Sequence, residues 1–159
     1  MNNRTFRRWL YRGRRPNWIA RMLNRVDAAV GSLGIASRYG VVTLEVIGRT
    51  SGRTITLPLV MVVVDGRRYL ASMLGDDVQW VKNVWAARGR VVLHSGGHRE
   101  QVRLEEIPPD QRAPILRVYL QRAPGARAHM PVDKAAPLAD FERIAPAYPV
   151  FHVAALAPE

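Results

Sequence analysis

The spacing of hydrophobic residues divides the chain into short segments, some with the period of a strand and others with that of a helix. Strands are indicated where β-branched residues cluster or apolar and polar positions alternate, over 41–47, 54–64, 67–73, 91–94, 100–107 and 150–153. Apolar residues three and four positions apart predict helices over 17–30, 78–88 and 109–121 and around Leu138, Phe141 and Ile144. The pattern therefore predicts about six strands and four helices.

Turn residues indicate how the strands are connected. Asp65-Gly66 is a strong signal for a two-residue hairpin, and Ser95-Gly96-Gly97 joins a second pair of strands. Pro58 inside the strand 54–64 predicts an edge or a bulge, while the apolar run 59–64 predicts a strand covered on both faces. Tight hairpins without regular strand–helix alternation disfavour a parallel Rossmann sheet. We expect an α+β fold, a small and mostly antiparallel barrel with covering helices.

Length and composition are those of one globular domain. The chain has 159 residues, 48% of them hydrophobic, with no internal repeat. The Ala/Pro-rich stretch 123–137 is expected to be an ordered loop because no second domain follows it. We therefore divide the chain into a basic arm over residues 1–16 and a single domain over residues 17–159.

Positive charge is concentrated at the start of the chain. The formal net charge is +11, and residues 1–26 hold eight arginines and no acid, which leaves +3 for the rest. Trp9, Leu10 and Tyr11 lie among these arginines, a mixture that favours an anionic membrane surface, or the protein's own body, over nucleic acid. A solvated arm is the simpler alternative. No apolar run approaches the ~20 residues of a membrane span.

The compartment is inferred from what the sequence lacks. There are no cysteines, which excludes disulfides and fits a reducing cytoplasm. The start lacks the apolar core of a signal peptide, so export is not expected. We expect a cytoplasmic protein, peripheral at the inner face of the membrane if the arm binds lipid, and either a monomer or a homodimer.

The loop Gly48–Arg53 carries the clearest chemical signal. Thr50 and Ser51 lie between two glycines, and Arg49 and Arg53 flank the pair. Backbone N–H groups, hydroxyls and guanidinium groups in such a loop can all face one anion, and phosphate is the obvious ligand. An ordinary basic hairpin loop has the same composition, so both interpretations stay open. The loop is not a P-loop, since it lacks the Gly-Lys-Ser/Thr ending.

Other candidate residues are weaker alone. Trp80 and Asn83 share one side of the predicted helix 78–88, where they either pack on the barrel or face a ligand. His129 lies in a compact loop that could line a pocket. His94 and His98 flank a Gly-Gly turn at a spacing that makes a weak metal pair, and we predict no metal site. No Ser/His/Asp arrangement can be argued, so a cofactor should carry any redox chemistry.

Taken in order, these residues resemble the deazaflavin-dependent nitroreductase family, whose members are split β-barrels of the FMN-binding type. The resemblance covers 41–153. It is carried by the loop 48–53, the strand containing Pro58, the small-residue turn 71–75, and a W-x-x-N-x-x-A pattern formed by Trp80, Asn83 and Ala86. The segments 123–133 and 148–151 are similar to one branch of that family.

The resemblance implies binding of reduced coenzyme F-420, a deazaflavin with a phosphate group. The implied phosphate ligands are Arg49, Thr50, Ser51, Gly52 and Arg53, and the implied ring neighbours are Pro58, Ser72, Trp80 and Asn83. The implied reaction is hydride transfer to a small electron-poor acceptor such as a quinone, a nitroaromatic or an activated enone. Ser72 and His129 are the implied catalytic residues.

The sequence also departs from the family pattern. Thr50 and Asp77-Val78 stand where many relatives carry lysines, and Trp85 stands where an arginine is common. Two alternatives therefore remain open. One is an oxidoreductase that uses FMN on the same barrel, because its phosphate suits the same loop. The other is a non-enzymatic carrier of an apolar ligand at the membrane surface. Nucleic-acid binding by the arm is disfavoured.

Overall fold

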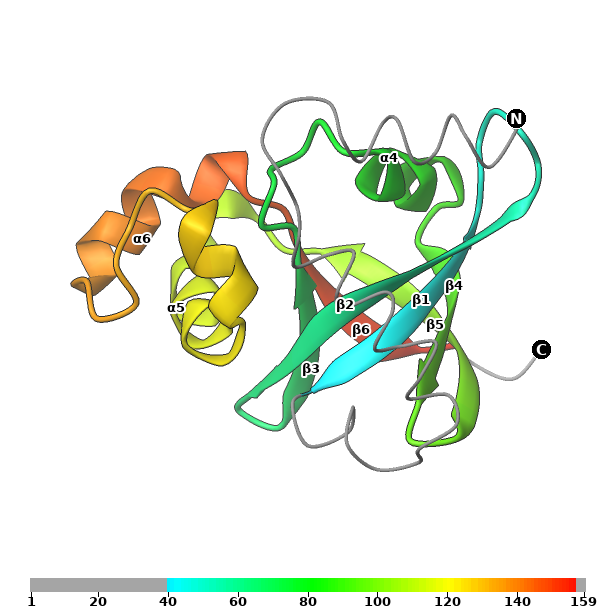
Figure 1. The fold of residues 1–159 in the computed structure, drawn as a ribbon, viewed down its shortest axis with the longest axis horizontal. Helices are drawn as coiled ribbons and strands as arrows, with labels where there is room; N and C mark the ends of the chain where they lie inside the picture. Colours follow the sequence, from blue (N-terminus) through cyan, green and yellow to red (C-terminus); the bar gives the residue numbers. More distant parts are fainter. Residues whose placement is uncertain (1–39, 157–159) are drawn as a thin grey trace.

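A closed barrel of six strands forms the body of the protein (Figure 1). The computed structural model describes residues 40–156. All strand pairs are antiparallel, in the order β1-β2-β3-β6-β5-β4, and β4 pairs with β1 to close the barrel. The strands are β1 (Val41–Ile47), β2 (Thr54–Val64), β3 (Arg67–Ala71), β4 (Arg90–Ser95), β5 (His98–Glu106) and β6 (Val150–Ala155). The predicted antiparallel barrel of six strands is confirmed.

Three helices cover the barrel in the part of the chain that the structure describes. They are α4 (Gln79–Ala86), α5 (Ala113–Arg122) and α6 (Leu138–Ile144), with 3-10 turns η1 (Pro109–Gln111), η2 (Pro124–Ala128) and η3 (Ala145–Ala147). None of these helices is long and apolar enough to cross a membrane. The basic arm and the helix predicted over 17–30 lie outside the described residues, so the arm's membrane contact stays a prediction, as does the oligomeric state.

The helix predicted over 109–121 is divided into two parts. Pro114 lies in the first turn of α5, where a residue without an N–H group leaves no hydrogen bond unmade. Proline would interrupt a helix that ran on from η1, so a new helix begins at Ala113. The prediction of one continuous helix was therefore wrong at this point. The loop predicted over 123–137 contains the turn η2.

The first part of strand β2 is paired on one side only, and the later part is covered on both faces. Residues before Met61 pair with β1 alone, because pairing with β3 begins at Met61. Pro58 lies in this one-sided part, opposite Thr43, so the predicted edge position is confirmed. Further along, alternate side chains pack inside the barrel and against α5. Val63 is the exception at 60% exposure, beside the hairpin that ends the strand.

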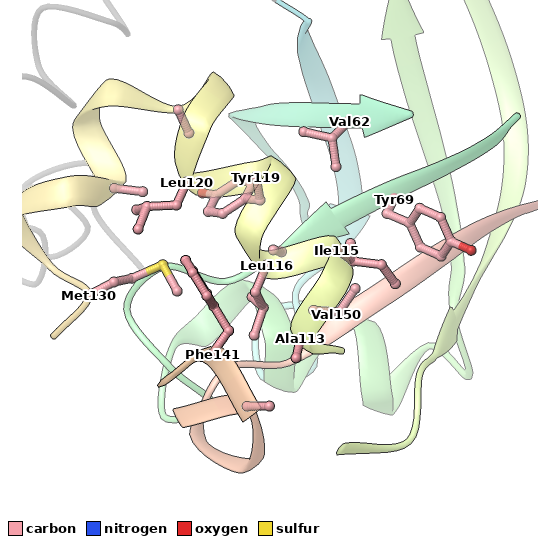
Figure 2. Packing of buried hydrophobic residues seen from close by; sticks show 14 residues of the cluster. Val62, Tyr69, Ala113, Ile115, Leu116, Tyr119, Leu120, Met130, Phe141 and Val150 are labelled. Carbon is pink, nitrogen blue, oxygen red and sulfur yellow. The ribbon is translucent and has the colours of Figure 1, made fainter. Parts of the chain in front are cut away.

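Two hydrophobic cores hold the fold together. One fills the barrel and includes Val81 and Val84 of α4, which lies over one end of the barrel (Figure 1). The other lies outside the barrel, between β2, β3, β6 and the helices α5 and α6. Figure 2 shows Leu120, Met130 and Phe141 of this second core pointing toward one another. The barrel therefore carries α4 on its end and a separately packed group of helices on its side.

Gly89, between α4 and β4, provides a test of this packing. Its φ is +78°, and a Cβ atom there would lie 2.3 Å from the backbone oxygen of Leu104. Gly66 has a similar φ of +74°, but a Cβ atom there would meet nothing within 4 Å. We expect Gly66→Ala to cost about 1–2 kcal/mol from backbone strain alone, and Gly89→Ala to cost at least about 1–3 kcal/mol more because of the clash. Urea unfolding of both variants measures the difference, and equal losses would contradict the close approach of Gly89 to β5.

Candidate functional site

The loop Gly48–Arg53 joins β1 to β2 and is closed by its own hydrogen bonds. The N–H of Gly48 donates to the carbonyl of Arg53 at 2.8 Å, and the N–H of Gly52 donates to the carbonyl of Gly48 at 2.8 Å. The N–H of Arg53 donates to Oγ of Ser51 at 3.2 Å. These three N–H groups therefore serve the loop itself. The expectation that backbone N–H groups face an anion does not hold for these three, so the predicted phosphate site rests mainly on side chains.

Arg49 is held against α4 by two neutral amide side chains. Oδ1 of Asn83 accepts from the backbone N–H of Arg49 at 3.1 Å and from its Nη1 at 3.0 Å. Oε1 of Gln79 accepts from the same Nη1 at 2.8 Å. We call Arg49, Gln79 and Asn83 the Arg49 clamp. Since neither amide carries a charge, the clamp orients the guanidinium group without neutralising it.

The outer face of the loop offers further donors. Thr50, Ser51 and Arg53 are exposed, and a Cβ atom at Gly52 would meet nothing within 4 Å. Oγ of Ser51 acts as an acceptor within the loop, which leaves its own proton for another acceptor. An oriented guanidinium group, hydroxyls and a second arginine on one short exposed loop form a donor set that fits a phosphate group.

Asn83 takes a different position from the one expected. It is only 2% exposed and lies behind Arg49, so it supports the arginine from inside the protein. Trp80 is half-buried, and its ring packs on Phe151 of β6 with 5.7 Å between the ring centroids. Pro58 is half-buried in β2. Trp80 therefore contributes to the mouth of the barrel through packing, whereas Asn83 acts through the Arg49 clamp.

A second group of predicted residues meets around Tyr148. Ser72 is 2% exposed, its N–H donates to the carbonyl of Pro149 at 3.0 Å, and its hydroxyl donates to the carbonyl of Gly75 at 2.5 Å. The hydroxyl of Tyr148 donates to the backbone carbonyl of His129 at 3.3 Å. We call Ser72, His129 and Tyr148 the Tyr148 cluster. The two residues predicted to be catalytic therefore bond to neighbouring residues of one segment, Ser72 to Pro149 and the His129 carbonyl to Tyr148, through separate contacts.

Ser72 and Tyr148 each donate their one hydroxyl proton to a backbone carbonyl, but the Tyr148 bond is the longer one, at 3.3 Å against 2.5 Å. The Ser72 proton, in the shorter bond to the Gly75 carbonyl, is therefore the more firmly held of the two. Partial burial raises the pKa of the Tyr148 phenol above the usual value of 10.0, so the hydroxyl stays protonated at neutral pH. Sequence reasoning considered His129, Met130 and Tyr148 for this pocket region and left the donor open, because the partial burial of the phenol is not visible in the sequence. A tyrosine within the family-like segment 148–151 was the available signal.

Two of the remaining histidines, His94 and His152, lie beside surface carboxylates. Nε2 of His94 lies 2.5 Å from Oε2 of Glu45, and this hydrogen bond is the main cause that lowers the pKa of Glu45. His152 lies 3.4 Å from Glu105. Between residues 40 and 156 there is no group of three or more His, Cys, Asp or Glu residues that could hold a metal ion.

A shallow depression on the outer wall of the barrel lies away from the predicted site. It is lined by residues of β1, β4 and β5, among them Glu45, Ile47 and Arg90, and by Leu156. None of the predicted site residues lines it. We therefore define the site by the donor geometry of the loop and not by this depression.

The chain matches the family model described as F420H(2)-dependent quinone reductase over residues 17–139. The protein belongs to this family. It is therefore an oxidoreductase, and reduced coenzyme F-420 is its cofactor. The match favours F-420 over the FMN alternative and an enzyme over a carrier of an apolar ligand. No curated protein matches the chain.

Solved structures with TM-scores above 0.5 share the fold at low sequence identity. One, described as a domain-swapped dimer, has a TM-score of 0.53 and 19% identity, and the match covers 86% of this chain and 97% of that one. A conserved hypothetical protein of Mycobacterium tuberculosis, Rv2991, has a TM-score of 0.54 and 16% identity, with 82% and 81% covered. An F420-H2-dependent reductase, FDR-A, has a TM-score of 0.47 and 20% identity, with 72% and 93% covered.

The Arg49 clamp predicts a difference between its two amides. Asn83→Leu removes a buried acceptor of two hydrogen bonds and should lower the free energy of unfolding by about 1–3 kcal/mol. Gln79→Leu removes one exposed hydrogen bond and should cost less than about 1 kcal/mol. Urea unfolding gives both values, and hydrogen exchange of the loop 48–53 should accelerate more in Asn83→Leu. Equal effects of the two substitutions would show that Asn83 has no special part in holding Arg49.

Proposed function

We propose that the protein reduces a quinone or a similar planar electron-poor acceptor, with the loop 48–53 holding the cofactor phosphate and the Tyr148 cluster facing the acceptor. The observation that carries this proposal is the Arg49 clamp. A guanidinium group on an exposed loop normally samples many conformations, and ordering it costs conformational entropy. Here two amides order it in advance and leave its charge available, which favours binding of a phosphate group.

Each loop residue has a role in this proposal. Arg49 and Arg53 bind phosphate oxygens through charge-assisted hydrogen bonds, while the hydroxyls of Thr50 and Ser51 donate to the same group. Gly52 keeps the outer face of the loop open, because its φ of +66° suits glycine and it has no side chain. Reduced F-420, when bound, supplies the hydride. The chain itself contributes orientation of the ring and the acceptor.

The Tyr148 cluster provides what the acceptor needs. As a quinone gains a hydride at one end, negative charge develops on its oxygen, and a nearby donor stabilises that charge. The phenol of Tyr148 can turn its proton from the His129 carbonyl, 3.3 Å away, toward this oxygen, transfer it there and regain a proton from solvent. Ser72 positions the turn beside it, and His129 contributes its backbone carbonyl, which holds the phenol. Ser72 and His129 are thus assigned positioning roles in place of the catalytic roles first expected.

The cofactor assignment is tested by titration. We expect fluorescence quenching to give tight binding of F-420 and weaker binding of FMN. Loss of one charge-assisted contact costs about 1.5–3 kcal/mol, so Arg49→Ala should weaken F-420 binding roughly 10- to 150-fold. Arg53→Ala should also weaken it. Arg117→Ala, which removes an exposed arginine of α5, is the control and should leave binding unchanged. Tight FMN binding without a response to F-420, or no effect of Arg49→Ala, would overturn the proposal.

The donor assignment is tested by kinetics with a soluble quinone. Tyr148→Phe keeps the ring and removes the proton, so kcat should fall about 100-fold or more, while the Kd for F-420 stays the same. His129→Ala keeps the backbone carbonyl and should leave kcat nearly unchanged. Because the pKa of Tyr148 is raised above 10.0, its protonation should add no change in rate between pH 6 and 9. A larger loss in Ser72→Ala than in Tyr148→Phe would return the donor role to Ser72.

A further inference from the structure

Trp85 has an environment that simple packing on the barrel does not explain. It lies in α4, 43% of its surface is exposed, and its Nε1–H donates to Oε2 of Glu106 at 2.8 Å. Glu106 is the last residue of β5, so this bond joins the helix of the Arg49 clamp to the barrel wall. The indole nitrogen thus has a specific partner on another element.

The other oxygen of Glu106 leads into the protein. Oε1 accepts from Nη2 of Arg112 at 3.0 Å, and the Arg112 side chain is only 6% exposed. The same guanidinium donates from Nε to the carbonyl of Ile107 at 2.7 Å. Its Nη1 lies 3.1 Å from the carbonyl of Ala145 and 3.4 Å from those of Pro146 and Tyr148. One buried arginine therefore organises the backbone just before β6.

We propose that Trp85, Glu106 and Arg112 are positioning residues that hold Tyr148 at a set place relative to the Arg49 clamp. This inference rests on the proposed function for its consequence in catalysis. A single carboxylate accepts from α4 on one oxygen and from Arg112 on the other, and Arg112 in turn fixes the backbone carbonyl of Tyr148. We call this chain of hydrogen bonds the tie. It connects α4, which carries the Arg49 clamp, with Tyr148, which we propose to face the acceptor.

The tie has an electrostatic requirement. A buried guanidinium group needs a compensating charge, and Glu106 is the carboxylate paired with Arg112. Glu106→Gln keeps the shape but offers one acceptor oxygen and an NH2 group to two donors, so one bond of the tie is lost. Trp85→Phe keeps the ring and the Glu106–Arg112 pair and removes only the bond to α4. The two variants therefore separate the outer half of the tie from the inner half.

Two readouts test the proposal. The first is hydrogen exchange at the Tyr148 amide, which bonds to the Ala145 carbonyl at 3.2 Å. Glu106→Gln should accelerate this exchange about tenfold relative to the amides of the β2–β3 ladder, and Trp85→Phe should change it less. The second is kinetic. Misplacement by about 1 Å can cost about 100-fold in rate, so we expect a several-fold or larger fall in kcat with the quinone in Glu106→Gln, with the Kd for F-420 unchanged within twofold.

Glu105→Gln is the matched control. It is the same substitution one residue earlier, on the opposite face of β5, where Oε2 of Glu105 lies 3.4 Å from Nδ1 of His152 and more than half of the Glu105 side chain is exposed. This variant should leave both readouts at wild-type values. Uniform acceleration of all amides in Glu106→Gln, or an equal effect in Glu105→Gln, would overturn the positioning role. If the wild-type protein failed to bind F-420, the proposed function would fail, yet the exchange experiment would still decide whether the tie exists.

Discussion

The candidate site depends on one oxygen atom, Oδ1 of the buried Asn83. It accepts two hydrogen bonds from Arg49, one from the backbone N–H and one from Nη1. The loop 48–53 is short, glycine-bounded and mostly exposed, so it has little core of its own. Asn83 connects it to α4, and α4 is held in turn by Val81 and Val84, which pack into the barrel core. This helix has only eight residues and no side-chain cap, so its position comes from packing and not from its own propensity.

The charge of a partner decides what an arginine can do in this fold. Arg49 is bonded to neutral amides, which set its direction and leave its charge for a ligand. Arg112 is bonded to the carboxylate of Glu106 and to backbone carbonyls, and it is almost completely buried. Its charge is compensated within the protein, so its role is structural. The two residues have the same side chain but different environments, since burial and the charge of the partner differ, and only Arg49 suits the ligand-binding role that we propose.

Separation into two cores places the two halves of the site on different parts of the molecule. The barrel core carries α4 and therefore the Arg49 clamp, whereas the side core carries the segment that leads to Tyr148. Ser72 lies between them, at the end of β3, and bonds to Pro149 beside Tyr148. Hydride transfer needs its two reactants at a defined separation. Because the Arg49 clamp and Tyr148 are attached to different cores, a defined separation between them requires a connection. We propose that Glu106 provides this connection.

Local patterns in the sequence determined the strands, the hairpins and the loop. Their period-two alternation and turn residues such as Asp65-Gly66 act between near neighbours, so they remain visible in one sequence. The edge position of Pro58 was predicted for the same reason. The continuous helix over 109–121 was predicted wrongly, because its periodicity continues through a proline that starts a new helix. Motif order also predicted the family and its cofactor, which the family match bears out.

Tertiary structure decided the roles of individual residues. In the sequence, Asn83 was a helix residue that faced either the barrel or a ligand, Tyr148 was one aromatic residue in a loop, and Arg112 was one arginine among many. Arg49 and Asn83 are 34 positions apart in the sequence, and Arg112 and Tyr148 are 36 positions apart. Such long-range pairs produce no periodic pattern in the sequence, because the two residues become neighbours only when the barrel closes. The sequence therefore determined which elements form and which chemistry is available, and the folded barrel alone decided which side chains support a ligand and which ones can touch it.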